Sequence, residues 1–283
     1  MNLLHIMTHL EKADPEVYNR LDTRRAAMKS FTSFSTKLAL AAVPIALGSM
    51  FNKAYAGAKG SKETVLEVLN YALTLEYLEA EFYATAVSKG TSLVPAGAAA
   101  TAIMTIADHE AQHVTFLKTA ISGAGGTPVD KPVFDLSGGK GTGTGPFKDA
   151  FSNYELFLAV AQTLEDTGVR AYKGRAAELV QAGDVLTAAL NIHSVEARHA
   201  AHIRSMRKAN GFGDVKPWIT GKETGIGDIV QASYNGEENT KQATIDIINI
   251  NGQPINAAAA SEAFDEPLSK EQVLTIVNPF LVP

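Results

Sequence analysis

Four glutamates and two histidines stand on apolar helical stripes of this sequence. Two of the glutamates are followed by histidine three residues later, in Glu110-Ala-Gln-His113 and Glu196-Ala-Arg-His199. The other two, Glu76 and Glu165, occur singly between apolar positions. Residues three apart share one face of a helix, so each Glu and its His can reach a common point in the core. Buried carboxylates are costly unless they are paired, protonated or bound to metal. The spacing therefore predicts a metal site inside a helical bundle.

The order Glu, Glu-x-x-His, Glu, Glu-x-x-His is the ligand set of carboxylate-bridged di-iron and di-manganese helical bundles. Four carboxylates balance two divalent ions, and oxygen plus imidazole ligation favours iron or manganese, with zinc possible. The predicted cofactor is two Fe or two Mn ions. The predicted metal ligands are Glu76, Glu110, His113, Glu165, Glu196 and His199. The chain has no cysteine, which excludes thiolate ligands and iron–sulfur clusters. The alternative is an ordinary helical domain with surface glutamates and two core histidines.

These ligands require four helices to position them. Three- and four-residue apolar steps predict helices over 62–89, about 96–122, from near Asp149, and about 184–210. Glu110 follows Glu76 by 34 residues and Glu196 follows Glu165 by 31, which indicates a duplicated helical hairpin. The glycine-rich stretch 123–147 lacks a phosphate-loop pattern and is interpreted as a long connection. We predict an all-α four-helix bundle in which this crossover leaves the second and third helices parallel.

The segment 211–283 follows the predicted bundle, which we assign to residues 57–210. Its helical pattern is broken, and 243–250 could be a strand or an irregular arm. Ser269-Lys-Glu-Gln has the spacing of a capping box and predicts a short helix ending before Pro279. The end of the chain is too apolar to remain exposed, so we expect this C-terminal arm to pack on the bundle or on a partner subunit of a homodimer.

Residues 1–56 have the features of an export signal. Arg24-Arg25 precedes an apolar run from Leu38 to Phe51, which is short for a membrane span, and Ala54-Tyr55-Ala56 resembles a signal-peptidase site. This pattern resembles a twin-arginine signal and predicts an exported, periplasmic protein without a stable membrane span in its mature form. An uncleaved anchor or an amphipathic helix is the alternative. Removing this +3 segment from a chain of net charge −5 leaves a body of −8, which disfavours nucleic acid as a partner.

The segments around these ligands resemble bacterial ferritin-like domain proteins, with the exported, desiccation-related type as the nearest branch. The resemblance rests on residues 75–83 (LEYLEAEFY), 108–114 (DHEAQHV), 165–172 (EDTGVRAY) and 195–200 (VEARHA) and covers roughly 62–210. It implies the six metal ligands named above. Glu79 and Glu81 are close enough to Glu76 to compete with it, whereas His109 and His202 are expected beside the site or at the surface.

The resemblance implies chemistry on oxygen, peroxide or iron(II). Tyr83 and Tyr172, each seven residues after a lone glutamate, are candidate catalytic residues as hydrogen-bond or electron donors, with simple packing as the alternative. The first hypothesis is a dimetal oxidoreductase, ferroxidase-like or manganese-catalase-like, whose partners are metal ions and a small oxidant. The second is a non-catalytic metal-binding or structural protein of the envelope with a role in stress. A storage cage is disfavoured because a shell would have to accommodate the long C-terminal arm.

Overall fold

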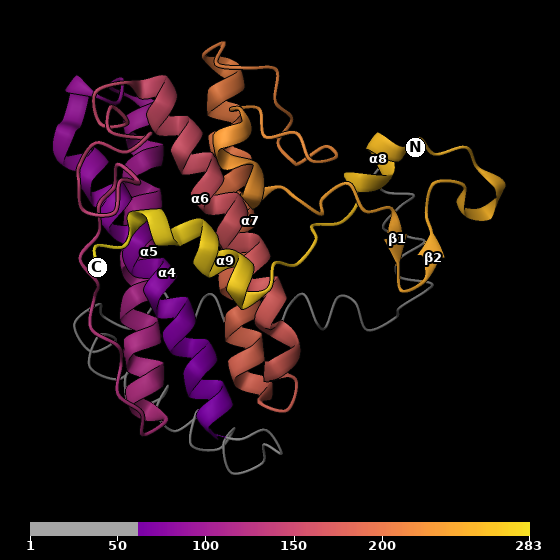
Figure 1. The fold of residues 1–283 in the computed structure, drawn as a ribbon, viewed down its shortest axis with the longest axis horizontal. Helices are drawn as coiled ribbons and strands as arrows, with labels where there is room; N and C mark the ends of the chain where they lie inside the picture. The colour runs from indigo at the N-terminus through magenta and orange to yellow at the C-terminus, as the bar shows by residue number, and fades with distance from the viewer. Residues whose placement is uncertain (1–61) are drawn as a thin grey trace, which may run out of the picture. The chain divides into compact units, whose positions relative to one another are not determined.

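The computed structural model describes residues 62–283, so the predicted export signal lies outside the described residues. Four long helices form the bundle: α4 (Lys62–Lys89), α5 (Ala98–Gly123), α6 (Tyr154–Arg175) and α7 (Gly183–Ala209). Figure 1 shows them side by side, with the remaining segments outside this core. Short 3-10 turns, η1 (Gly90–Ser92) and η2 (Ala176–Leu179), follow α4 and α6. The predicted all-α four-helix bundle is confirmed.

Each half of the bundle is an antiparallel hairpin. In the first, Lys62 at the start of α4 bonds to the carbonyl of Gly125 just beyond the end of α5. In the second, Gln162 of α6 bonds to Arg207 of α7, and Asp166, one turn later in α6, pairs with Arg204, three residues earlier in α7. Consecutive helices therefore return along each other, as short connections require.

The two hairpins pack so that α4 lies against α6 and α5 lies against α7. Tyr83 of α4 contacts Glu165, and Glu76 contacts Tyr172 seven residues farther along α6, so α4 and α6 are antiparallel. Since α4 is antiparallel to both α5 and α6, these last two helices run parallel. The crossover topology predicted from the glycine-rich segment is thus the observed one.

The crossover between α5 and α6 is irregular but ordered around one carboxylate. Asp135 accepts hydrogen bonds from the backbone N–H groups of Ser137, Gly141 and Gly143 at 2.8–3.0 Å. Gly141 has φ +90°, which favours glycine at that turn. The predicted start of the third helix near Asp149 is wrong by a few residues. The helix begins at Tyr154 because Asn153 caps it, its side chain accepting from the N–H of Leu156.

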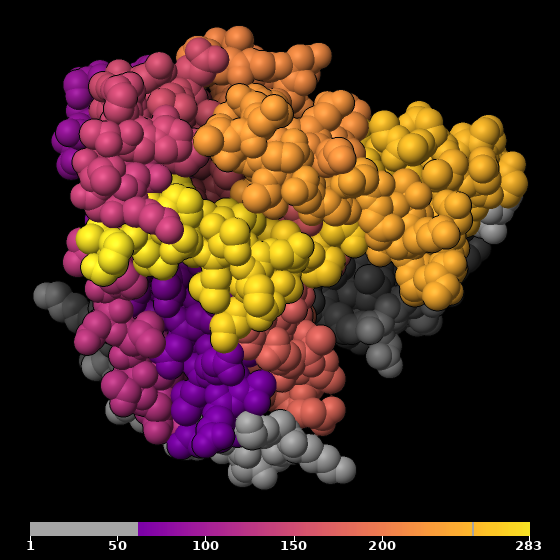
Figure 2. Space-filling model, in the orientation of Figure 1, coloured from indigo at the N-terminus to yellow at the C-terminus, as the bar shows by residue number. Residues whose placement is uncertain are grey.

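The C-terminal arm consists of short elements separated by turns. They are η3 (Asp228–Ser233), β1 (Lys241–Gln242), β2 (Ile245–Asp246), η4 (Ile250–Gly252), α8 (Ala257–Ser261), α9 (Lys270–Val277) and η5 (Asn278–Phe280). The strands pair antiparallel, with Lys241 opposite Asp246. The capping box at Ser269 is present, as predicted. Figure 2 shows the C-terminal residues, in yellow, lying across the helices of the bundle.

Polar contacts attach the arm to the outer face of α6. Arg170 is buried and donates to the carbonyls of Ser233 and Asn235, and it pairs with Glu237 at 2.7 Å. Val273 on α9 is fully buried. As a result α6 is covered on both sides and is the most completely buried of the four long helices. Within 62–283, no helix combines the length and the apolar character needed to span a membrane.

Candidate metal centre

The structure brings the six predicted ligands together at the centre of the bundle. Glu76, Glu110, Glu165 and Glu196 have no exposed surface, one from each helix. His113 and His199 lie one turn beyond Glu110 and Glu196 and are largely buried. The i, i+3 spacing places each imidazole above its own carboxylate, and the antiparallel packing of α5 and α7 turns both pairs toward each other.

One group of ligands surrounds the imidazole of His113. Its Nδ1 atom lies 3.1 Å from Glu76 Oε2, 3.2 Å from Glu110 Oε2 and 3.2 Å from Glu196 Oε1. The carboxylates come from three different helices. One atom of each of these four residues lies within 4.8 Å of the others, the spacing of donors around a single ion.

The second group surrounds His199. Its Nδ1 atom lies 2.9 Å from Glu110 Oε1 and 3.3 Å from Glu165 Oε2. Glu110, Glu165, Glu196 and His199 again place one donor atom each within 4.8 Å of the others. Glu110 and Glu196 therefore belong to both groups, whereas Glu76 serves only the first and Glu165 only the second.

Several oxygen and nitrogen atoms that could bind a metal are buried in the centre without a hydrogen-bond partner. They are Glu110 Oε1, Glu165 Oε2, both carboxylate oxygens of Glu196, and His199 Nδ1. His199 Nδ1 and Glu110 Oε1 are close, but they are not aligned for a hydrogen bond with each other. Buried polar atoms are rarely left unpaired, because each costs about 1–3 kcal/mol. A cation between these atoms would satisfy all of them, so the residues present fit a metal.

Two tyrosines hold the outer carboxylates. The Tyr83 hydroxyl donates to Glu165 Oε1 at 2.5 Å, and the Tyr172 hydroxyl donates to Glu76 Oε1. Each tyrosine follows the lone glutamate of its own helix by seven residues and bonds to the glutamate of the other helix. The contact from Tyr83 of α4 to Glu165 of α6 is thus matched by the contact from Tyr172 of α6 to Glu76 of α4. Both side chains are buried and act as hydrogen-bond donors, beyond simple packing.

Burial dominates the electrostatics of the carboxylates. Desolvation, with the nearby charge of Glu196, raises the pKa of Glu76 well above its ordinary value, and desolvation with the charge of Glu110 does the same to the pKa of Glu196. Burial also raises the pKa of Glu165. Glu110 differs: burial acts in the same upward direction, but a hydrogen bond from His113 and the close contact with His199 lower its pKa to about 2.

At the two imidazoles burial acts to lower the pKa, but the neighbouring carboxylates outweigh it. Burial favours the neutral ring of His199, but the charge of Glu165 and a contact with Glu110 raise its pKa to about 10. Burial is likewise outweighed at His113, whose pKa is raised by contacts with Glu110 and Glu196. Protons and divalent cations are therefore alternative ways of neutralising the same buried negative charge.

A fifth carboxylate, Glu79, lies beside the centre. It is 4% exposed, and burial together with the charge of Glu196 raises its pKa well above the ordinary value. Gly168 of α6 faces it: a Cβ atom added there would lie 3.2 Å from Glu79 Oε1 and 3.4 Å from Glu196 Oε2. The spacing Glu76 to Glu79, one turn apart, is the sequence signal for this neighbour, but only the packing of α6 makes Glu79 buried.

Of the other polar residues near the centre, one contacts a ligand and the rest lie at or toward the surface. His109 Nδ1 lies 3.0 Å from His199 Nε2, so it supports the second imidazole from outside the centre. His202 and Asp108 are exposed. Glu81 is directed outward and pairs with Lys131 at 2.8 Å. Glu81 therefore does not compete with Glu76 for the centre.

Comparison with known proteins places the bundle in a family. The model of the ferritin-like domain family matches residues 64–209, slightly more than half of the chain and all four bundle helices. No curated protein matches the chain. The fold and the buried acidic and histidine cluster are compatible with metal binding, and the family match covers every residue of that cluster. The chain therefore belongs to the ferritin-like domain family.

Proposed function

We propose that this protein binds two divalent metal ions in one carboxylate-bridged centre. The observation that carries the proposal is the overlap of two four-residue donor groups that share Glu110 and Glu196. Glu110 and Glu196 could each contribute to both ions, and Glu76 with His113 and Glu165 with His199 would complete the two ends. Dinuclear sites place their ions about 3.5–4 Å apart, which suits bridging carboxylates.

Iron and manganese are the proposed metals, with zinc as a third possibility. Carboxylate oxygens and imidazole nitrogens suit iron and manganese, and the described part of the chain offers no softer ligand at the centre. The four carboxylates of the ligand set neutralise two divalent ions. Glu79 adds one further carboxyl group beside the centre, and this group can hold a proton.

We propose dimetal oxidoreductase chemistry, ferroxidase-like or manganese-catalase-like. Ions held by the six ligands would supply the electron transfer; the balanced ferroxidase reaction consumes two iron(II) ions, one dioxygen and two protons and yields two iron(III) ions and one hydrogen peroxide. The protein orients the carboxylates through Tyr83 and Tyr172, which donate to Glu165 and Glu76. It excludes bulk water, because the ligands are buried. Glu79 can hold a proton within the same enclosed region.

Metal stoichiometry tests the dimetal centre. Purified protein is loaded anaerobically with iron(II) or manganese(II), and bound metal is measured per chain by mass spectrometry. We expect two ions in the natural protein, one in Glu76→Gln and in Glu165→Gln, and none in Glu110→Ala or Glu196→Ala. Helical circular dichroism should be retained, because the remaining carboxylates can be protonated.

Glu81→Gln is the matched control, since Glu81 lies on the same helix as Glu76 but at the surface. Equal stoichiometry in the natural protein and in both Ala variants would rule the centre out.

Activity assays separate the two functional hypotheses. Iron(II) oxidation and peroxide consumption are measured on the loaded protein and on Tyr83→Phe and Tyr172→Phe. Turnover that falls in the Phe variants at unchanged metal content supports the oxidoreductase. Full metal occupancy without turnover supports the non-catalytic metal-binding protein of the envelope instead.

We further propose that the protein is exported and belongs to the desiccation-related, stress-associated branch of its family. Support for export comes from the paired Arg24-Arg25, the apolar run and Ala54-Tyr55-Ala56 in residues 1–56, whereas the branch of the family rests on the resemblance of 75–83, 108–114, 165–172 and 195–200. Replacing both arginines by lysine should retain the protein in the cytoplasm with an intact N-terminus. Unchanged distribution and an unchanged N-terminus in this variant would contradict export.

A further inference from the structure

The two imidazoles of the centre differ in what lies on the far side of each ring. We name the two donor groups after them, as the His113 position and the His199 position. Both rings direct Nδ1 toward carboxylates. The Nε2 atom of His199 lies 3.0 Å from Nδ1 of His109, whereas within residues 62–283 the Nε2 atom of His113 has no hydrogen bond to the chain. Only the His199 position therefore has an imidazole that is contacted at both ring nitrogens.

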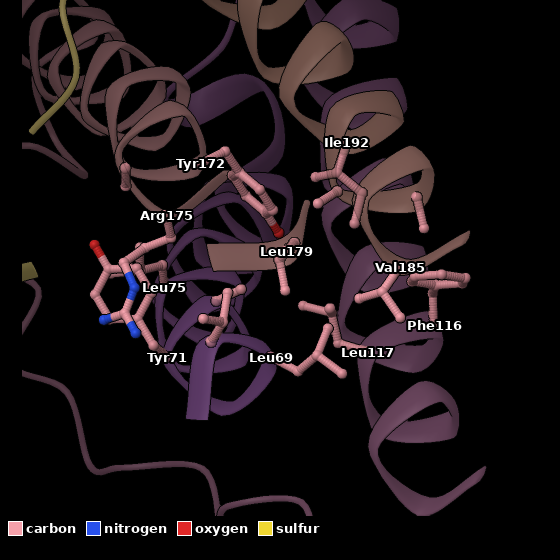
Figure 3. A pocket seen from close by; sticks show the side chains of 15 residues that line it. Leu69, Tyr71, Leu75, Phe116, Leu117, Tyr172, Arg175, Leu179, Val185 and Ile192 are labelled. Atoms are coloured by element: carbon pink, nitrogen blue, oxygen red, sulfur yellow. The ribbon is translucent and has the colours of Figure 1, made fainter. Parts of the chain in front are cut away.

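Apolar side chains lie next to the imidazole of the His113 position. Leu117, one turn after His113 in α5, and Ile192 of α7 line an apolar pocket of the bundle. Figure 3 shows both side chains together with Tyr172, whose hydroxyl is already bonded to Glu76. Leucine and isoleucine offer no hydrogen-bond acceptor to an imidazole. The ring of His113 is therefore oriented by packing and by its carboxylate neighbours alone.

His109 reaches the far side of His199 from α5, where it directly precedes the ligand Glu110. The two rings are nearly parallel, with 16° between their planes and 5.2 Å between their centroids. The 3.0 Å between the two nitrogens is a hydrogen-bond distance. His109 is half-buried and His199 is buried, so this contact lies at the edge of the enclosed centre.

This contact determines which nitrogen of His199 carries the proton when the ring binds a metal. The nitrogen that binds a metal must present a lone pair, and in His199 that atom is Nδ1, which lies among the carboxylates. The proton of the neutral ring is then on Nε2, and this N–H donates to Nδ1 of His109. Partners of this kind orient a ligand ring and increase its basicity, and their loss costs about 10–100-fold in metal affinity.

We propose that His109 is a positioning residue that makes the His199 position the tighter of the two metal positions. The inference rests on the proposed function for the presence of two ions. The centre then fills in a fixed order, because the imidazole of the His113 position has no such partner. The first ion occupies the His199 position, and the ion at the His113 position is bound second and released first.

Single-ion variants measure each position separately. Glu76→Gln removes a ligand of the His113 position and leaves the His199 position intact, and Glu165→Gln does the reverse. Manganese(II) is titrated into each variant, and the free ion is measured by electron paramagnetic resonance. We expect the Kd for manganese(II) to be about 10–100-fold lower in Glu76→Gln than in Glu165→Gln. Equal dissociation constants, or the opposite order, would overturn the proposal.

Two substitutions of His109 separate the hydrogen bond from the packing of the rings. His109→Phe keeps a ring against His199 but removes the acceptor, whereas His109→Asn keeps an acceptor oxygen at the place of Nδ1 without the ring. Combined with Glu76→Gln, His109→Phe should raise the Kd about 10–100-fold and His109→Asn should leave it nearly unchanged. Combined with Glu165→Gln, neither should have an effect. His202→Phe is the matched control, the same change at an exposed position of α7.

The opposite pattern, weaker binding in His109→Asn and none in His109→Phe, would show that ring packing matters and would overturn the positioning role. Equal weakening of both metal positions by His109→Phe would overturn it as well.

Nuclear magnetic resonance of the metal-free protein tests the hydrogen bond itself. The Nε2 proton of His199 should exchange slowly with water and show a coupling to Nδ1 of His109, and both signatures should be lost in His109→Phe. Their absence from the natural protein would overturn the proposal. Failure of the proposed function is distinguishable, because the natural protein then binds no ion although the coupling is present. If only this inference fails, two ions bind and His109→Phe weakens neither position.

Discussion

The centre is built from residues that would destabilise the bundle in any other arrangement. Four ligand carboxylates and Glu79 are buried together, and only His113 and His199 bring compensating positive charge. Gly168 makes room for this group, since α6 approaches Glu79 and Glu196 without a side chain. A glycine inside a helix costs about 1 kcal/mol relative to alanine, so its presence here is explained by the space it leaves.

Gly168→Ala should therefore weaken metal binding. The new Cβ would lie 3.2 Å from Glu79 Oε1, which must then shift by a few tenths of an ångström, and 3.4 Å from Glu196 Oε2, at the limit of ordinary contact. We expect metal affinity to fall about 10–100-fold, the usual cost of disturbing groups around ligands, while helix content is maintained. Competition with a chelator measures the affinity. Gly183→Ala is the control, since a Cβ there meets nothing within 4 Å. Equal affinities in the two variants would contradict the role of Gly168.

Among the segments of secondary structure and their connections, the crossover between α5 and α6 is more regular in its hydrogen bonds than its composition suggests. Its glycines and threonines suggest a loose connection, yet the Asp135 carboxylate gathers the backbone N–H groups of Ser137, Gly141 and Gly143. Gly145 is needed where the chain closes, because a Cβ there would lie 2.3 Å from the carbonyl oxygen of Ser137. These contacts close this part of the crossover on itself, and Phe134 within it forms an antiparallel bridge with Leu281 near the C-terminus.

The hydrogen bonds around Asp135 predict a pH dependence. The Ser137 hydroxyl, followed by the N–H of Gly143, lowers the pKa of Asp135 to about 2. A lowered pKa stabilises the fold at pH values above the unfolded-state pKa, and this contribution is lost as pH falls toward 2. Asp135→Asn should cost about 1–3 kcal/mol at neutral pH, and the difference from the natural protein should shrink between about pH 4 and pH 2.

Urea unfolding at several pH values measures this difference. The matched control is Asp149→Asn, in the same crossover but exposed and paired only with Lys148. A difference between Asp135→Asn and the natural protein that stays constant down to about pH 2 would contradict the assignment.

For the molecule as a whole, the C-terminal arm and the bundle form one continuous structure. Arg170 connects them: it is fully enclosed, pairs with Glu237, and donates to backbone carbonyls at three places in the arm. The arm also contributes apolar residues to the core, among them Leu268 and Val273. The outer face of α6, which would otherwise be exposed, is thus covered by the same chain.

Replacing Arg170 should release the arm but preserve the bundle. Arg170→Met leaves Glu237 and several carbonyls buried without a partner, and breaking a buried ion pair costs about 3–5 kcal/mol. We expect faster hydrogen exchange and proteolysis over residues 228–268, with metal stoichiometry retained. Arg198→Met, an exposed position on α7, is the control. Loss of the bundle helices together with the arm would show that the arm is required for folding.

The sequence alone determined the four helices, the crossover topology and the six residues that meet at the centre. Helical periodicity can be recognised from residues three and four apart in the sequence. A carboxylate among the apolar residues of one helix face is expected to be buried, and this too can be recognised from the sequence of that helix. The predicted start of the third helix, near Asp149, was a few residues too early. Asn153 caps the helix, so it begins at Tyr154.

Tertiary structure decided the features that depend on distant contacts. Glu79 is buried because Gly168 of another helix lies against it. The arm has little periodicity, so its position follows from the contacts of Arg170 with residues 63 to 96 positions away. Such contacts arise only when packing brings separate segments together, and no local pattern in the sequence encodes which segments will meet.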